Sequence, residues 1–280
     1  MPRGAGRGAR RRRRGMASRV ALGFLLVIVA SAVLAPVLTP YQRDEQNIQQ
    51  RLARPDARHP FGTDALGRDI LTRAMYGGRI SLGVAVISTL VALTLGIFVG
   101  ATAGYVGGRV DGVLTGVVDL ALSIPIFFLL LLMGSWWGSS FWMLCLVIGL
   151  ATWMPVARLV RASTLSLRER DFVEAARALG MSSFRIVVRH ILPNTVAPIL
   201  VAAAIGSAQA ILLETALGYL GFGAQPPTPT WGNMLRDVQD QYLQAPWGAV
   251  FPGLLIFLTV LALHVLSDAL RDRLDPRLRT

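Results

Sequence analysis

Six apolar runs, each about as long as a bilayer is thick, set the limits on how this chain can fold. A hydrocarbon core of about 30 Å needs roughly 20 mostly apolar residues in a helix. The runs cover approximately 20–38, 80–105, 113–133, 141–157, 195–220 and 247–266. Backbone polar groups in lipid must be satisfied within the spanning segment, so we expect an all-α polytopic membrane protein with about six transmembrane helices.

The arginines are distributed unevenly around these runs. With six spans and both termini inside, 20 of the 28 arginines fall on the inside, as the positive-inside rule requires. The weak point is the first outside loop, where seven arginines between Arg43 and Arg79 are offset by five acids. We expect a multi-pass protein of the cytoplasmic membrane with four parts. They are a disordered basic cytoplasmic tail (1–19), a first helix and extracytoplasmic loop (20–79), a transmembrane core (80–270) with a long cytoplasmic loop at 158–193, and a cytoplasmic tail (271–280).

The basic N-terminal stretch has competing interpretations. Arg10–Arg14 before an apolar run is also typical of a signal peptide, but this run is longer than usual and no clear cleavage site follows, so we interpret it as a retained anchor. The Gly/Arg composition lies directly before a span, where basic residues fix orientation, so we expect no nucleic-acid binding. Translation from Met16 would remove most of the tail.

Several functions are excluded by residue types that are missing or isolated. All 28 basic residues are arginine, so a Walker A phosphate loop and Schiff-base chemistry, which need lysine, are ruled out. The single cysteine, Cys145, allows no disulfide within the chain, and His59, His190 and His264 lack the spacing of metal ligands. We expect no enzymatic activity and no cofactor in this chain.

The polar segment 158–193 predicts a helical hairpin. Asp171 is a candidate N-cap with Glu174 as its capping-box partner, and Gly180 is a candidate helix stop. A second short helix follows and should end at Pro193. The first helix carries one apolar stripe, made of Phe172, Ala175, Ala176 and Leu179.

Three interpretations of this hairpin compete. A DNA-binding helix-turn-helix has the same outline, but two flanking spans would hold duplex DNA against the bilayer. A plain connector between spans is the second. A docking element is the third, favoured by the small residues Ala175, Ala176 and Gly180, which let another protein approach closely.

The residues of this hairpin carry a family resemblance. The run EAARALG at 174–180, followed by ILPN at 191–194, resembles the EAA loop of permeases from binding-protein-dependent ABC importers. Other stretches resemble the C-type subunit of dipeptide and oligopeptide permeases: HPFGTD at 59–64, GRD at 67–69, QPPTP at 225–229, APW at 245–247 and LDPR at 274–277. The resemblance implies a type I ABC importer permease fold (MetI-like) and import of di- or oligopeptides.

The resemblance also implies partners. They are a homologous second permease, two cytoplasmic ATPase subunits (or one fused ATPase) that bind the ATP and Mg²⁺, and an extracytoplasmic peptide-binding protein. The residues expected to couple to the ATPase are Asp171, Glu174, Ala175, Ala176, Leu179, Gly180 and Arg185. Gly180→Asp is expected to abolish transport and spare membrane insertion. Alternatives are nickel chelates, haem or sugars as substrate, or a self-sufficient secondary transporter or channel.

Two acids fall within the expected spans, Asp119 and Glu214. A charge at the bilayer centre costs about 2.5 to 3.5 kcal/mol, so each should face protein or water. Both are candidates for the translocation path. For Asp119 a position near the inner interface is the alternative, and for Glu214 a buried hydrogen bond between helices.

Overall fold

The computed structural model describes residues 5–137 and 140–274. These residues form helices and connecting loops, with one isolated β-bridge between Thr63 and Asp69. The all-α expectation is confirmed. Residues 1–4 of the expected basic tail, and most of the expected tail at 271–280, lie outside the described residues.

Five helices of the described chain are long and apolar enough to cross a membrane, and a bent helix pair brings the number to as many as six. The membrane helices are α1 (Ala5–Val33), α3 (Ile70–Val106), α6 (Phe141–Arg168), α9 (Leu192–Leu220) and α11 (Trp247–Leu274). A short helix, α2 (Ala35–Leu38), follows α1.

The third expected span is a broken one. It consists of α4 (Gly108–Ser123) and α5 (Ile126–Trp137), which meet at an angle of 87°. Pro125 causes the break, since proline has no N–H to donate and forces the preceding residue out of the helical region. Ile124 accordingly has an extended backbone (φ −85°, ψ 124°). The expectation of one continuous helix over 113–133 is therefore wrong.

Two helices begin earlier than the hydropathy pattern predicts. In α3 the Asp69 side chain accepts a hydrogen bond from the Thr72 N–H (2.7 Å) and caps a helix that starts at Ile70, ten residues before the expected span. Helix α1 starts at Ala5 rather than near Val20, so most of the tail expected to be disordered is helical. Arginine is a good helix former, and extending an existing helix is easier than nucleating one.

Helices α3 and α6 pack against each other more extensively than any other pair of elements in the described chain. The contact follows glycines of α3 that are spaced four residues apart. A Cβ atom at Gly96 would lie 2.6 Å from the Cβ of Val156, and one at Gly104 would lie 2.8 Å from the Cβ of Thr164 on the same helix. Small residues at this spacing let two membrane helices approach closely. These glycines therefore serve packing between helices of this chain.

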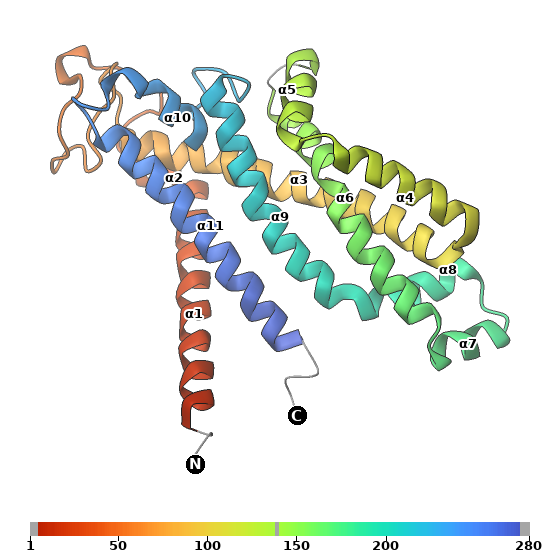
Figure 1. The fold of residues 1–280 in the computed structure, drawn as a ribbon. Coiled ribbons are helices and arrows are strands. Elements are labelled where there is room, and N and C mark those ends of the chain that lie inside the picture. Colours follow the sequence, from red (N-terminus) through yellow and green to blue (C-terminus); the bar gives the residue numbers. More distant parts are fainter. Residues whose placement is uncertain (1–4, 138–139, 275–280) are drawn as a thin grey trace.

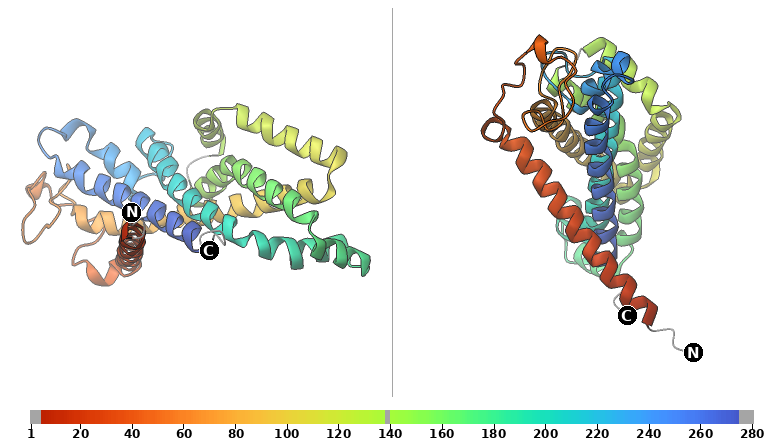
Figure 2. Two further views of the ribbon diagram at one scale, coloured as in Figure 1. Left: turned by 60° about the horizontal axis from the view of Figure 1, so that its bottom comes forward. Right: turned by 90° about the vertical axis from the view of Figure 1, so that its left-hand side faces the viewer.

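Two polar regions lie at opposite ends of the helices (Figure 1). One, called the cap here, consists of residues 40–69 and 221–246 and includes α10 (Trp231–Asp237) and the 3-10 helices Ile48–Gln50 and Gln239–Gln241. The other, called the hairpin, consists of α7 (Asp171–Ala178), α8 (Ser183–Ile186) and the π-helical turn Val187–Ile191. The start of α1 and the end of α11 lie on the hairpin side (Figures 1 and 2).

Candidate functional site

The hairpin holds its turn with a full set of helix-ending hydrogen bonds. The N–H of Met181 donates to the carbonyl of Ala176 (3.1 Å), and the N–H of Gly180 donates to the carbonyl of Arg177 (3.0 Å). Gly180 has φ +76°, the left-handed conformation that such a Schellman motif needs. The prediction that Gly180 stops the first helix is confirmed.

The start of α7 differs from the prediction. Arg170, not Asp171, occupies the N-cap position, and no side chain caps the helix. The predicted capping box of Asp171 with Glu174 is therefore wrong. Both acids lie in the first turn of α7, where their charge complements the helix dipole.

The inner face of the hairpin is a small core, and its outer face is an exposed apolar stripe. Val173 and Ala176 of α7 pack against Ile186 and Ile191, and all four are at most 4% exposed. Ala176 is therefore a packing residue of the hairpin. The expectation that Ala176 lets another protein approach closely is wrong. The exposed stripe consists of Phe172, Leu179 and Phe184, which are 42%, 84% and 79% exposed.

The other predicted coupling residues lie on the same surface. Glu174, Ala175 and Arg185 are exposed, with Glu174 and Ala175 on α7 and Arg185 on α8. The structure thus brings them together with the exposed stripe on one hairpin, at the far end from the cap (Figure 2). Sequence reasoning missed Val173 and Ile186, although their apolar character and their spacing within the hairpin were visible signals.

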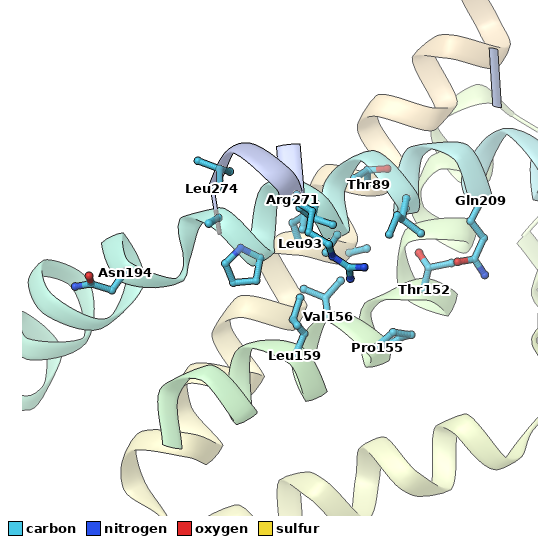
Figure 3. Close-up of a pocket in the computed structure, with 17 residues that line it drawn as sticks. Thr89, Leu93, Thr152, Pro155, Val156, Leu159, Asn194, Gln209, Arg271 and Leu274 are labelled. Carbon is cyan, nitrogen blue, oxygen red and sulfur yellow. The ribbon is translucent and has the colours of Figure 1, made fainter. Parts of the chain in front are cut away.

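A cavity of about 620 Å³ lies between α3, α6, α9 and the end of α11 (Figure 3). Most of its lining is apolar, glycine or proline. The polar exceptions are Thr89, Thr152, Asn194, Gln209 and Arg271, and no aspartate or glutamate of the described residues lines it. Neither acid predicted for the translocation path, Glu214 or Asp119, is among the lining residues.

Comparison with protein families decides the identity of this fold. The family of binding-protein-dependent transport system inner membrane components matches residues 92–280, and the N-terminal transmembrane domain of oligopeptide transport permease C matches residues 7–55. This chain belongs to the binding-protein-dependent transport system inner membrane components. It is thus a membrane-embedded permease component of an ABC importer, rather than an enzyme, and works with ATPase and substrate-binding partners.

Individual relatives agree with this membership. The permease is 41% identical to the dipeptide transport system permease protein DppC of Alkalihalophilus pseudofirmus, over 91% of this chain and 85% of the relative. It is 38% identical to a Brucella suis protein whose name marks it as a candidate peptide permease, over 99% and 93% of the two chains. Its fold matches an inward-facing structure of the MetNI methionine ABC transporter with a TM-score of 0.59, at 18% identity, covering 71% of this chain and 94% of that one.

The permease continues from the hairpin into α9 without a break, which corrects another expectation. Pro193 was expected to end the second hairpin helix, but α8, the π-helical turn and α9 run on through it. Proline has no backbone N–H to donate to the preceding turn. The neighbouring Asn194 side-chain amide donates to a carbonyl of that turn, that of His190 (2.7 Å). The wider π turn also relieves the crowding that a proline ring causes one turn back. The second half of the hairpin and α9 therefore form one continuous helical segment.

Glu214 lies fully buried at the junction of three helices of the permease. Its Oε2 atom accepts from the hydroxyl of Ser81 on α3 (2.9 Å), and Ser81 accepts from the backbone N–H of Trp231 on α10 (3.2 Å). Glu214 therefore forms the buried hydrogen bond between helices that the sequence analysis gave as its alternative role. A role on the translocation path stays a prediction.

Asp119 lies on α4 with about half of its side chain exposed, and accepts from Arg158 of α6 (2.6 Å). Asp111 forms a second, two-bonded pair with Arg161 of the same helix. The two ion pairs hold α4 against α6. Sequence reasoning did not identify Asp111 as a partner in this pair.

The cap of the permease is tied together by buried charges. Arg68 donates to Asp64 (2.6 Å) and to Asp237 of α10 (3.3 Å), and Arg73 of α3 also donates to Asp237 (3.5 Å). Asp64, Arg68 and Arg73 are at most 9% exposed. Two of the arginines that weakened the positive-inside count, Arg68 and Arg73, are thus paired with acids of the cap.

A histidine and an arginine extend the cap toward α1 and α3. His59 is hydrogen-bonded to Asp69 and to Gln50 (both 2.9 Å). Arg79 donates to the carbonyls of Ala32 and Val33 (both 2.6 Å), which end α1 and have no partner within that helix. The first helix is therefore fixed to the core by its last turn.

Proposed function

We propose that this chain is a permease subunit of an ABC importer that carries di- or oligopeptides across the cytoplasmic membrane. ATP hydrolysis takes place, with Mg²⁺, on separate ATPase subunits, because this chain contains no lysine for a phosphate loop. The names of the dipeptide and peptide permeases among its relatives support a peptide substrate. Nickel chelates, haem or sugars are the alternative cargo.

The observation that carries the proposal is the exposed stripe of the hairpin. Leu179 and Phe184 expose 84% and 79% of their surface, although the hairpin has an apolar core of its own in which they could have been buried. Exposed apolar residues on a rigid element, rimmed by the charges of Glu174 and Arg185, mark a protein interface. The occupant we propose is an ATPase subunit of the transporter.

The orientation and the subunit composition are part of the same proposal. The hairpin, the start of α1 and the end of α11 lie on one side, and most arginines belong to that side. We assign this side to the cytoplasm. The complete importer contains a homologous second permease, two ATPase subunits or one fused ATPase, and a peptide-binding protein on the cap side.

The coupling step follows from the continuity of hairpin and α9. Closure of the ATPase dimer displaces the hairpin, and α9, which lines the cavity, moves with it. Gly180 keeps the turn in place, while Glu174, Ala175 and Arg185 orient the contact. This is a coupling between two separate sites through a shared conformational equilibrium.

The test is Leu179→Asp in the complete transporter. A carboxylate at the centre of an apolar contact is desolvated without a partner, so copurification of the ATPase and peptide-stimulated ATP hydrolysis should fall at least about tenfold. Leu243→Asp is the control, because Leu243 is 99% exposed but belongs to the cap. Equal ATPase recovery with Leu179→Asp and Leu243→Asp would refute docking at the hairpin.

Cargo is tested by reconstituting the same complex in vesicles. ATP-driven uptake of labelled di- and oligopeptides is the expected result. Uptake of nickel chelate, haem or sugar in place of peptides would leave the permease assignment intact and replace the substrate.

A further inference from the structure

The cavity between α3, α6, α9 and α11 has a one-sided charge. Arg271 is the charged residue among its lining residues, and its guanidinium points into the cavity (Figure 3). No acidic side chain of the described residues lines the space, so the guanidinium meets no opposite charge there. Arg271 is exposed, as expected of a residue at the open end. An anionic group entering the cavity would be attracted to it.

The remaining polar groups of the cavity suit an amide backbone. Gln209 carries both a donor and an acceptor, as a peptide group does. The Thr152 hydroxyl donates to the carbonyl of Ile148 (2.8 Å), which leaves its lone pairs to accept an N–H from a ligand. The rest of the wall is mostly apolar, and its two other polar side chains already have partners in the chain: Thr89 is hydrogen-bonded to Ser207 (3.2 Å), and Asn194 donates to the carbonyl of His190 (2.7 Å).

Size restricts the ligand further. A volume of about 620 Å³ lies within the range of cavities that hold small organic ligands. The lining of α9 extends from Asn194 to Gln209, which is about 22 Å of helix. An extended chain covers at most about 3.3 to 3.6 Å per residue, so the cavity accommodates peptides of up to about six residues.

We propose that this cavity is a binding site for short peptides with a free carboxyl terminus, which pairs with Arg271 while Gln209 and Thr152 bind the peptide backbone. Guanidinium and carboxylate form paired hydrogen bonds of complementary geometry. The assignment rests on the proposed function and deepens it, because it names the part of the substrate that is recognised. The site would bind the carboxyl terminus and the backbone amides, which all peptides share. The side chains of the peptide would lie against the apolar walls.

The experiment measures the charge of the cavity directly, with Thr152→Cys in the full chain, assembled into the complete transporter in lipid nanodiscs. The native Cys145 is fully buried and serves as the background. We compare the rates at which an anionic and a cationic methanethiosulfonate of similar size modify the new cysteine. Adding Arg271→Gln should lower the anion-to-cation ratio about tenfold, because one lost charge slows one reagent and speeds the other.

Arg273→Gln is the matched control. It removes the same charge two residues further along, from a side chain that does not line the cavity, and should change the ratio less than about twofold. Dialanine should protect the cysteine more strongly than dialanine amide, and Arg271→Gln should remove the difference between them.

Several results would overturn the assignment. They are a ratio that Arg271→Gln leaves unchanged, equal protection by the two peptides, or a cysteine that reacts in the isolated permease but not in the complex, which would mean that a partner helix fills the cavity. Uptake of dialanine is measured in parallel with the native permease in the complete transporter, because Thr152 is itself a proposed binding residue. Normal uptake together with any of these results would reject this site and keep the proposed function, whereas a transporter without peptide uptake would reject the proposed function itself.

Discussion

The cap and the hairpin lie at opposite ends of the same helices and differ in which side chains they bury and which they expose. The cap buries charges and pairs them within the chain, as Asp64, Arg68 and Arg73 do. The hairpin leaves large apolar side chains, among them Leu179 and Phe184, in the open. The cap also exposes single apolar side chains, such as Leu243, and these are normal on any surface, whereas several large ones on one short hairpin mark a surface where another protein binds.

The largest expected effect on folding comes from breaking the charge network of the cap. Asp64→Asn leaves the buried Arg68 with only the more exposed Asp237. The buried Arg73 keeps Asp237 and the similarly exposed Asp44, which lie 3.5 and 3.9 Å away. Removing one partner of a buried ion pair costs about 3 to 5 kcal/mol, so the unfolding temperature of the purified permease should fall sharply. Arg43→Gln is the control, since its pair with Asp44 is 42% and 35% exposed and contributes at most about 1 kcal/mol. Similar shifts for both variants would show that the network does not stabilise the cap.

A smaller effect is expected at the turn of the hairpin. Gly180 has φ +76°, but no atom lies within 4 Å of the position that a Cβ would take, so a substitution there strains only the backbone. Gly180→Ala should destabilise the turn by about 1 kcal/mol, whereas asparagine tolerates this conformation better. Trypsin cleavage after the exposed Arg177 should therefore be about fivefold faster in Gly180→Ala than in Gly180→Asn.

The asparagine variant also sharpens the expectation for Gly180→Asp. Aspartate and asparagine have nearly the same shape and both visit the left-handed region. If Gly180→Asp abolishes transport and Gly180→Asn does not, charge at the docking surface is responsible. Loss of transport in both variants would instead mean that the turn requires glycine itself.

The sequence predicted the two regions unequally well. The hairpin was recognisable because its signals are local: a glycine after a helix and a short motif of fixed spacing. The broken helix at Pro125 was not, since the run is apolar on both sides of the proline and hydropathy carries no information about angle. The early start of α3 could not be predicted because Arg73 and Arg79 are typical of a polar loop. Only the fold places their partners, Asp237 and the end of α1, beside them.

The cavity was the least predictable feature. Its lining comes from four helices, and Arg271 lies in a segment that reads as an ordinary basic end of a span. The acids that stood out in the sequence, Asp119 and Glu214, were conspicuous because charge is rare in a span, and the structure uses both to join helices. The rarity of acidic residues in a membrane span predicted that each has a partner, but it could not predict which residue that partner is.

The smallest expected effect is a pH dependence confined to the cap. The backbone N–H groups of His59 and Arg58 donate to the Asp56 carboxylate (2.6 and 2.8 Å), and the bond from His59 is the main cause that holds the pKa of Asp56 below its ordinary value. A carboxyl whose folded pKa is lowered stabilises the protein above its unfolded pKa of about 3.9, and this contribution disappears as the pH falls through the folded pKa.

Asp56→Asn should therefore be slightly less stable than the native chain at pH 6, and the difference should shrink as the pH falls below about 3.9, in thermal unfolding measured from pH 6 downward. Arg58→Gln keeps both N–H donors and removes only a weaker charge effect, so it should retain most of the native pH dependence. A difference between native and Asp56→Asn that stays constant with pH would assign the effect to shape rather than charge. It would also weaken the view that the cap is stabilised by ionised groups, the property that separates it from the hairpin.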